Sequence, residues 1–123
     1  MSYTFATIDE GQLAPDDAMA LRAALLDERT FRREQLNNLA EVWPSDGDLP
    51  RDEHTMARVE VLTVLATAAK VVLSEVDAAL GRIDTGHYGN CHLCDQPIPL
   101  QRLRILPHAR YCGPCHQLKE TVS

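Results

Sequence analysis

The residues best suited to chemistry are four cysteines in two Cys-x-x-Cys pairs, Cys91–Cys94 and Cys112–Cys115, separated by seventeen residues. Each pair can present two thiolates from one tight turn, and two such turns facing each other supply the tetrahedral sulfur ligands that Zn²⁺ prefers. A segment of about 40 residues buries too little apolar surface to fold alone, so the metal would also supply folding free energy. The pattern predicts one structural Zn²⁺ per chain, ligated by Cys91, Cys94, Cys112 and Cys115.

Two other uses of paired cysteines are alternatives to zinc. Disulfides need an oxidising compartment, but Met1–Glu10 has neither the basic nor the apolar region of a secretion signal, so we expect a cytoplasmic protein. Cys112-Gly-Pro-Cys115 also matches the dithiol of thiol oxidoreductases. That dithiol sits in a βαβ unit, and we predict no strand before Cys112. A thiol oxidoreductase therefore stays an alternative, and our expectation is that the protein is not an enzyme.

Four histidines lie in the same part of the chain, and each could in principle ligate a metal. Because four cysteines already complete a structural zinc site, these histidines are expected to be surface residues. They are His87, His92, His108 and His116.

The charge of the 123-residue chain is unevenly distributed. Residues 1–80 carry 15 acidic and 7 basic side chains, whereas residues 81–123 carry 3 acidic and 5 basic ones. An acidic arm joined to a mildly basic lobe favours a partner with a basic surface and argues against an arm that grips nucleic acid. The richest apolar run, Val61–Leu73, contains Lys70 and is too short to cross a membrane.

Residues 15–42 are predicted to form a helix after a loose leader, residues 1–14. Pro15 suits the first helical position, and Asp16 and Asp17 lie where the helix dipole is positive. Trp43-Pro44 ends the helix, since a residue before proline avoids the helical conformation. Three arginines interrupt the apolar stripe of this helix. The stripe consists of Leu21, Leu25, Leu36, Leu39 and Val42, with Phe31 nearby.

A second helix is predicted from Pro50 to Thr85, capped by Gly86 in the left-handed conformation. Its apolar residues alternate steps of three and four, which is the seam of a coiled coil. The seam residues are Val59, Leu62, Ala66, Ala69, Leu73, Val76, Leu80 and Ile83. A short turn joins the two helices, so residues 15–85 are expected to form an antiparallel hairpin with its tip near residues 44–52.

The second helix is apolar beyond this one seam. Six further residues widen its face: Val61, Val64, Leu65, Ala68, Val71 and Val72. They could contact the leader, the first helix at a broad angle, or a second copy of the chain. A monomer is favoured, and a homodimer is the alternative.

Residues 86–123 are predicted to form a small zinc-finger lobe. This segment has few apolar residues with which to form a core. A short helix is expected after Cys115, over His116–Thr121. The fold class is therefore mainly α: an antiparallel coiled-coil hairpin followed by a four-cysteine zinc-finger lobe with a short C-terminal helix.

Residues 82–115 match the pattern Arg-Ile-x-x-Gly-x-Tyr-Gly-x-Cys-x-x-Cys, then Ile-x-x-x-Arg-Leu, then Pro-x-Ala-x-x-Cys-x-x-Cys. The matching residues are Arg82, Ile83, Gly86, Tyr88, Gly89, Cys91, Cys94, Ile98, Arg102, Leu103, Pro107, Ala109, Cys112 and Cys115. In these positions, about a third of its length, the chain resembles the DksA/TraR family of C4 zinc-finger proteins. The preceding hairpin extends the resemblance in architecture.

The resemblance implies a regulator that binds RNA polymerase directly rather than DNA. Family members insert the hairpin tip into the secondary channel and keep the zinc lobe at its rim. Active members carry Asp-x-x-Asp-x-Ala where the second helix begins. Here Asp52 and Ala57 match, and Thr55 replaces the second Asp. The candidate tip residues are Asp46, Asp48, Asp52, Glu53 and Ala57; the alternative is that the acidic ones only solvate the turn.

The basic residues of the lobe have two interpretations. They are candidate contacts to the polymerase rim, or they belong to a zinc module that binds nucleic acid or another protein without a polymerase role. The residues are Arg82, Arg102, Arg104 and Arg110. Because they are few and no aromatic cluster lies among them, sequence-specific DNA binding is not expected.

The alarmone ppGpp acts jointly with some family members, which resemble one another in carrying basic residues at three positions. Those positions are Leu106, His116 and Glu75 in this chain. The phosphates of ppGpp require charge-assisted bonds from Arg or Lys, so the resemblance implies an action that is independent of ppGpp.

Overall fold

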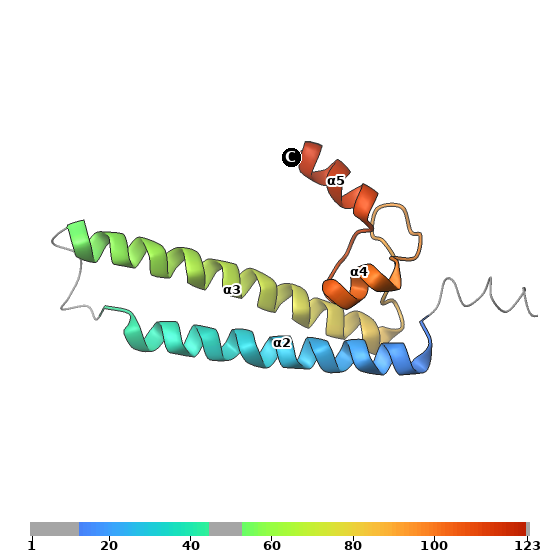
Figure 1. Ribbon diagram of the computed structural model, residues 1–123, viewed down its shortest axis with the longest axis horizontal. Coiled ribbons are helices and arrows are strands. Elements are labelled where there is room, and N and C mark those ends of the chain that lie inside the picture. Colours follow the sequence, from blue (N-terminus) through green and yellow to red (C-terminus); the bar gives the residue numbers. More distant parts are fainter. Residues whose placement is uncertain (1–12, 45–52, 123) are drawn as a thin grey trace, which may run out of the picture.

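The computed structural model describes residues 13–44 and 53–122. Its elements are α2 (Pro15–Val42), α3 (Glu53–Thr85), α4 (Leu100–Ile105) and α5 (Gly113–Val122). Figure 1 shows α2 and α3 side by side as a long hairpin, with α4 and α5 gathered at the end where α3 terminates. Over the described residues the regular elements are these helices, turns and loops connect them, and the β pairing is an isolated antiparallel bridge between Asn90 and Pro97. The predicted fold class is confirmed.

The bounds of α2 agree with the sequence prediction. Pro15 occupies the first turn together with Asp16 and Asp17, and Trp43 leaves the helix in an extended conformation before Pro44. The Nη2 of Arg58 donates a hydrogen bond of 3.1 Å to the carbonyl oxygen of Val42. This bond satisfies one of the carbonyls that a helix end leaves without a partner, and it ties the start of α3 to the end of α2.

The core of the hairpin follows the predicted seam of α3. Leu62, Ala69, Val76 and Leu80 are buried, and the other four seam residues are half-buried. On α2, Leu25 is fully buried against Val76, Ala79 and Leu80. Burial of this kind contributes about 25 cal/mol per Å² of apolar surface, so the seam is the main source of hairpin stability.

Two residues of the predicted α2 stripe are corrected by the structure. Phe31 and Val42 are exposed, whereas Leu36 and Leu39 are half-buried. Phe31 lies six residues after Leu25, which turns it about 120° away from the core at 100° per residue. The apolar stripe of α2 is therefore narrower than predicted.

The wider apolar face of α3 is not covered by α2. Val61, Val64 and Val71 have exposed fractions of 58%, 66% and 51%. Contact with the first helix therefore does not account for these three residues, whereas Val72 is half-buried and packs against the core around Leu25. Of the leader, residues 1–14, residues 1–12 lie outside the described residues, and Leu13 packs against the lobe and not against this face.

A second core joins the lobe to the hairpin. It consists of Leu21, Cys91, Ile98 and Leu103, with Leu13 and Tyr88 among the half-buried residues around it. Leu21 belongs to α2 and Leu103 to α4, a helix of six residues that the sequence analysis did not predict. The lobe is thus docked on the base of the hairpin rather than tethered to it.

Candidate metal centre

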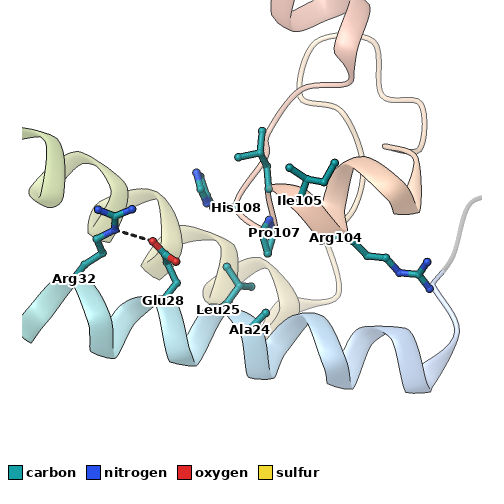
Figure 2. A pocket seen from close by; sticks show the side chains of 9 residues that line it. Ala24, Leu25, Glu28, Arg32, Arg104, Ile105, Pro107 and His108 are labelled. Carbon is teal, nitrogen blue, oxygen red and sulfur yellow. Dashed lines mark hydrogen bonds and ion pairs between the residues drawn. The ribbon is translucent and has the colours of Figure 1, made fainter.

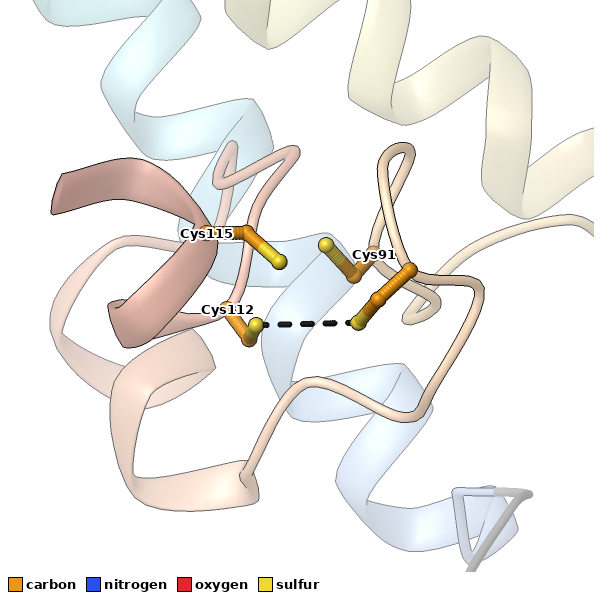
Figure 3. Close-up of side chains that lie close together, drawn as sticks. Cys91, Cys112 and Cys115 are labelled. Carbon is orange, nitrogen blue, oxygen red and sulfur yellow. Dashed lines mark hydrogen bonds between the residues drawn. The ribbon is translucent and has the colours of Figure 1, made fainter. Parts of the chain in front are cut away.

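The four cysteines of the lobe come together in space. Their Sγ atoms all lie within 4.8 Å of one another, and the cysteines are free of disulfides. Cys94 Sγ and Cys112 Sγ are 3.8 Å apart, joined by the dashed line in Figure 3, where the side chains of Cys91 and Cys115 point toward the same centre. A disulfide requires about 2.0 Å, so the cluster is not a pair of near-disulfides.

The first pair sits on a tight backbone turn. The amide of Cys91 donates to the carbonyl of Gln96 at 2.8 Å, and the amide of Asp95 donates back to the carbonyl of Cys91 at 2.9 Å. Asp95 adopts a φ of 61°, the left-handed conformation that Asp tolerates better than most residues. This turn presents Cys91 inward, where it is buried, and leaves Cys94 exposed.

The second pair lies where α5 begins. Cys112 directly precedes the helix and Cys115 is in its first turn, with the amide of His116 donating to the carbonyl of Cys112 at 2.9 Å. The predicted C-terminal helix is confirmed but starts at Gly113 instead of His116. A backbone bond of 2.8 Å from His92 to Arg110 holds the two knuckles together.

Hydrogen bonds within the cluster set the pKa values of the thiols. Burial acts to raise the pKa of Cys91, but the amides of Cys94, Cys112 and Leu93 outweigh it and lower this pKa to about 6. A side-chain hydrogen bond with Cys112, followed by burial, raises the pKa of Cys115 to about 12. A metal ion that binds here displaces the protons that its thiol ligands still carry.

The donor set fits Zn²⁺. Zn–S bonds of about 2.3 Å in a tetrahedron place the sulfurs about 3.8 Å apart, close to the separation of Cys94 Sγ and Cys112 Sγ. The turn also supplies an amide donor, since Leu93 N lies 3.4 Å from Cys91 Sγ. Four thiolates leave no open coordination position, so the site is structural: one Zn²⁺ that ties the two knuckles together.

The cysteine cluster does not include the histidines of the lobe, and His87, His92 and His116 are exposed whereas His108 is half-buried. His116 Nε2 lies 2.6 Å from Glu120 Oε1, and His87 Nδ1 lies 3.1 Å from Thr85 Oγ1. His92 packs edge-on against Tyr111, with ring centroids 6.1 Å apart. His108 is half-buried and faces the groove described below. Each therefore has a place in the lobe outside the metal centre.

The four arginines singled out in the sequence differ in their surroundings. Arg102 Nε donates to the carbonyl of Tyr111 at 2.9 Å, and Arg104 Nη2 lies 3.5 Å from Asp17 Oδ1. Arg102 therefore stabilises the lobe internally, and Arg104 connects the lobe to α2. Arg110 is exposed, and the half-buried Arg82 has a pKa lowered by burial and then by Arg110.

A groove of about 360 Å³ lies between α2 and the segment that follows α4. Figure 2 shows Arg32 and Glu28 on the hairpin side, paired at 2.7 Å, with Ile105, Pro107 and His108 on the lobe side. Arg104 points away from the groove toward the start of α2. The groove lies between the lobe and the hairpin. Its two arginines, Arg32 and Arg104, form ion pairs with Glu28 and Asp17 of the same chain.

The structure places the predicted tip residues only in part. Glu53 and Ala57 are exposed in the first turns of α3, at the end of the hairpin far from the lobe. Asp46, Asp48 and Asp52 lie outside the described residues. The start of α3 and the metal centre are therefore at opposite ends of the hairpin.

Sequence reasoning missed the contribution of Tyr88 to this site. Its hydroxyl donates a 2.7 Å hydrogen bond to the carbonyl of Pro107, and its ring packs against both hydrophobic cores. The signal was present, because Tyr88 belongs to the matched pattern, but its partner nineteen residues away depends on the tertiary fold. Tyr88 connects α3, the first knuckle and the loop after α4.

Comparison with known proteins places these observations in a family. A family model described as "Prokaryotic dksA/traR C4-type zinc finger" matches residues 86–120. An uncharacterised protein of Aquifex aeolicus (strain VF5) is 31% identical over 106 residues, which cover 83% of this chain and 70% of that protein.

Two solved structures are similar in fold. The structure of transcription factor DksA2 from Pseudomonas aeruginosa aligns with a TM-score of 0.76 at 24% identity, covering 90% of this chain and 88% of that one. The solution structure of the DnaK suppressor protein from Agrobacterium tumefaciens C58 aligns with a TM-score of 0.58 at 25% identity, covering 81% and 91%.

Within the described residues, no helix is both long enough and apolar enough to cross a membrane. The cysteine cluster and the hairpin agree with the match of the family model, and the 31% identical relative shares most of the length of the chain. This chain belongs to the DksA/TraR family of prokaryotic C4-type zinc-finger proteins.

Proposed function

We propose that this protein regulates transcription by binding RNA polymerase directly, with the hairpin tip entering the secondary channel and the zinc lobe at the rim. The observation that carries the proposal is the fold: a long hairpin that projects from a zinc lobe and matches transcription factor DksA2 over nearly its whole length. The zinc centre is structural in this proposal, and the protein has no enzymatic activity of its own. Its place of action is the cytoplasm.

The charge of the hairpin supports a partner of this kind. Residues 1–80 carry 15 acidic and 7 basic side chains, so the hairpin suits a positively charged channel. Glu53 and Ala57 are exposed where α3 begins, and Asp46, Asp48 and Asp52 precede them in the sequence. Carboxylates at the end of such a rod could act on hydrated Mg²⁺ or on basic residues of the active site.

The four candidate arginines for the rim fall into two groups: two that bond to other residues of this chain and two that are proposed to contact the partner. Arg102 and Arg104 are engaged by Tyr111 and Asp17, which supports a role in positioning the lobe. Arg110 is exposed and lies close enough to Arg82 and His92 to lower the pKa of both, after the larger effect of their burial. We propose Arg82 and Arg110 as the residues that meet carboxylates of the partner.

Independence from ppGpp is part of the proposal. Leu106 offers no hydrogen-bond donor, and Glu75 would repel phosphate groups. His116 Nε2 is engaged by Glu120 at 2.6 Å. The test is transcription with and without ppGpp, using a polymerase whose other alarmone site has been removed. A marked enhancement by ppGpp of this protein's effect would contradict independence.

The experiment that tests the function itself is binding to core RNA polymerase, followed by competition with another protein of the secondary channel. Asp52→Asn combined with Glu53→Gln is expected to retain binding but to change the transcription output. Asp84→Asn, which removes a carboxylate at the lobe end of α3, is the matched control. Lack of polymerase binding, combined with a salt-sensitive shift of DNA mobility, would favour the nucleic-acid module instead.

A further inference from the structure

Apolar packing between the two long helices decreases toward the end that is far from the lobe. Leu25 is the last buried residue of α2, and Leu62 is the first buried residue of α3. Both hydrophobic cores lie nearer the lobe, around Leu21 and Leu25. The end of α2 and the start of α3 are therefore held together by little buried apolar surface, and polar contacts between them carry more weight.

The end of α2 lacks a cation of its own. Its last turn has no basic residue and contains Glu41. The carbonyls at the C-terminus of a helix have no partners within the helix and carry partial negative charge, so they favour a nearby cation. Trp43 leaves the helix in an extended conformation, and its amide makes a long bond of 3.4 Å to the carbonyl of Ala40. This helix end is suited to a cation that another element supplies.

Arg58 of α3 supplies that cation. Its Nη2 donates a hydrogen bond of 3.1 Å to the carbonyl oxygen of Val42, the last residue of α2. Because α3 begins at Glu53, Arg58 lies about 7.5 Å along the axis of α3, in its second turn. Arg58 is exposed, so the bond is of modest strength, and its loss should act locally without unfolding the hairpin.

This bond connects the two points between which the candidate tip is carried. The candidate carboxylates in that interval are Asp46, Asp48, Asp52 and Glu53. Since the bond fixes the last residue of α2 against the second turn of α3, it sets the direction in which the chain leaves one helix and enters the other. The sparse apolar packing at these helix ends leaves few other contacts that could compensate for its loss.

We propose that Arg58 is a positioning residue of the tip, and that its bond to Val42 orients the tip carboxylates for their effect on transcription. The inference rests on the proposed function, in which the tip acts on polymerase and the remainder of the hairpin and the lobe supply most of the affinity. Arg58 therefore sets how large the effect of bound protein is, and has little influence on how tightly the protein binds.

The first arm of the test uses the full-length zinc protein alone. Trp43 is the single tryptophan of the chain and directly follows Val42, so its fluorescence reports on this helix end. Arg58→Met removes the donor and the charge, and acrylamide quenching of Trp43 is expected to increase about 1.5- to 2-fold. Arg58→Lys keeps a charge and donors on a shorter side chain and should lie between the two.

The matched control for this arm is Arg33→Met, which removes the same charge from an exposed position of α2. It should leave the quenching of Trp43 unchanged. Circular dichroism and zinc content verify that each variant is folded. Quenching in Arg58→Met equal to that of wild type, or an equal increase in Arg33→Met, would overturn the proposal.

The second arm titrates each variant into a transcription reaction. For Arg58→Met, the maximal effect at saturating protein is expected to fall about two- to fivefold, while the concentration that gives half of it stays within about twofold of wild type. Arg58→Lys should recover part of the maximal effect, and Arg33→Met should retain all of it. An increased half-effect concentration with an unchanged maximum would mean that Arg58 contributes to binding and not to positioning, which contradicts the inference.

The two arms separate this inference from the proposed function. A wild type that does not bind core polymerase contradicts the proposed function and with it any role of Arg58 in transcription, whereas Trp43 still shows whether the bond holds the helix ends together. A wild type that binds and alters transcription, with Arg58→Met equal to it at saturation, contradicts the positioning role alone.

Discussion

The hairpin and the lobe are stabilised in opposite ways. Along the hairpin, apolar contacts repeat turn after turn from Leu62 to Leu80, so no single residue carries the whole structure. Among the described residues of the lobe, the buried aliphatic side chains are Ile98 and Leu103. Helix α2 contributes Leu21 to the same core. The comparison shows that a chain can divide its stability between a distributed seam and a single ion, and the two parts should fail under different treatments.

Removing a zinc ligand is expected to have the largest effect on stability and to unfold only the lobe. Cys112→Ser removes one ligand of a site whose apparent binding free energy is on the order of 10–16 kcal/mol in comparable small zinc domains. Zinc content is expected to fall well below one equivalent per chain. Because α4 and α5 contribute 6 and 10 helical residues against 28 and 33 from α2 and α3, far-UV circular dichroism should fall only slightly.

The same measurement can break the comparison. Loss of most of the helical signal in Cys112→Ser would show that the hairpin depends on the metal as strongly as the lobe does. Leu118→Ser changes an exposed residue of α5 and serves as the control.

The converse treatment targets the hairpin. Leu25 is fully buried against Val76 and Ala79, so Leu25→Ala should lower the free energy of unfolding by about 2–5 kcal/mol through lost burial and a cavity. Denaturation monitored at 222 nm gives the stability, and competition with a chromophoric chelator gives the zinc affinity. Zinc affinity should be nearly unchanged; a large drop would mean that the seam and the metal centre are one cooperative unit.

Tyr88 lies between the two parts and sharpens the comparison. Tyr88→Phe removes the 2.7 Å hydrogen bond to Pro107 at a cost of about 1 kcal/mol. Burial raises the pKa of Tyr88 to about 12, so the unfolded chain ionises first as pH rises. The unfolded state then binds fewer protons, and wild-type stability should fall between pH 10 and 12. The phenylalanine variant should lose this part of the decline; an identical pH dependence in both proteins would contradict the role of Tyr88.

The smallest effect is expected at the surface of the hairpin. Arg29 Nη1 lies 4.0 Å from Asp77 Oδ1, and both side chains are partly exposed. Such pairs contribute between about 0 and 1 kcal/mol, so Asp77→Asn should change the midpoint of denaturation only marginally. A loss comparable to that of Leu25→Ala would show that the hairpin depends on its charges and not on its seam.

The sequence predicted what local patterns determine. Pro15 and Trp43-Pro44 bracket α2 because proline restricts the backbone on either side, and Gly86 ends α3 with a φ of 78° as expected. The cysteine spacing predicted the metal cluster, because two short turns with two thiols each can supply four sulfur ligands to one ion. These features depend on residues that are close together in the chain.

What the sequence did not predict depends on distant contacts. The six residues of α4 are too few for a periodic pattern, and their position follows from the burial of Leu103 beside Leu21. The partner of Tyr88 lies nineteen residues away, and the exposure of Phe31 and Val42 depends on how α2 meets α3. No local pattern carries information about such pairings.

The shared core at the base of the hairpin also sets an order of events during synthesis. Leu13 and Leu21 leave the ribosome well before Leu103 and Cys115, which lie more than 80 residues later in the sequence. Contacts between such distant residues form slowly, because a long loop must close first. The α2–α3 seam can assemble beforehand, since its residues are already available. Zinc capture is therefore expected to be the last step of folding, and a chain interrupted before Cys112 would present a formed hairpin with no lobe at its base.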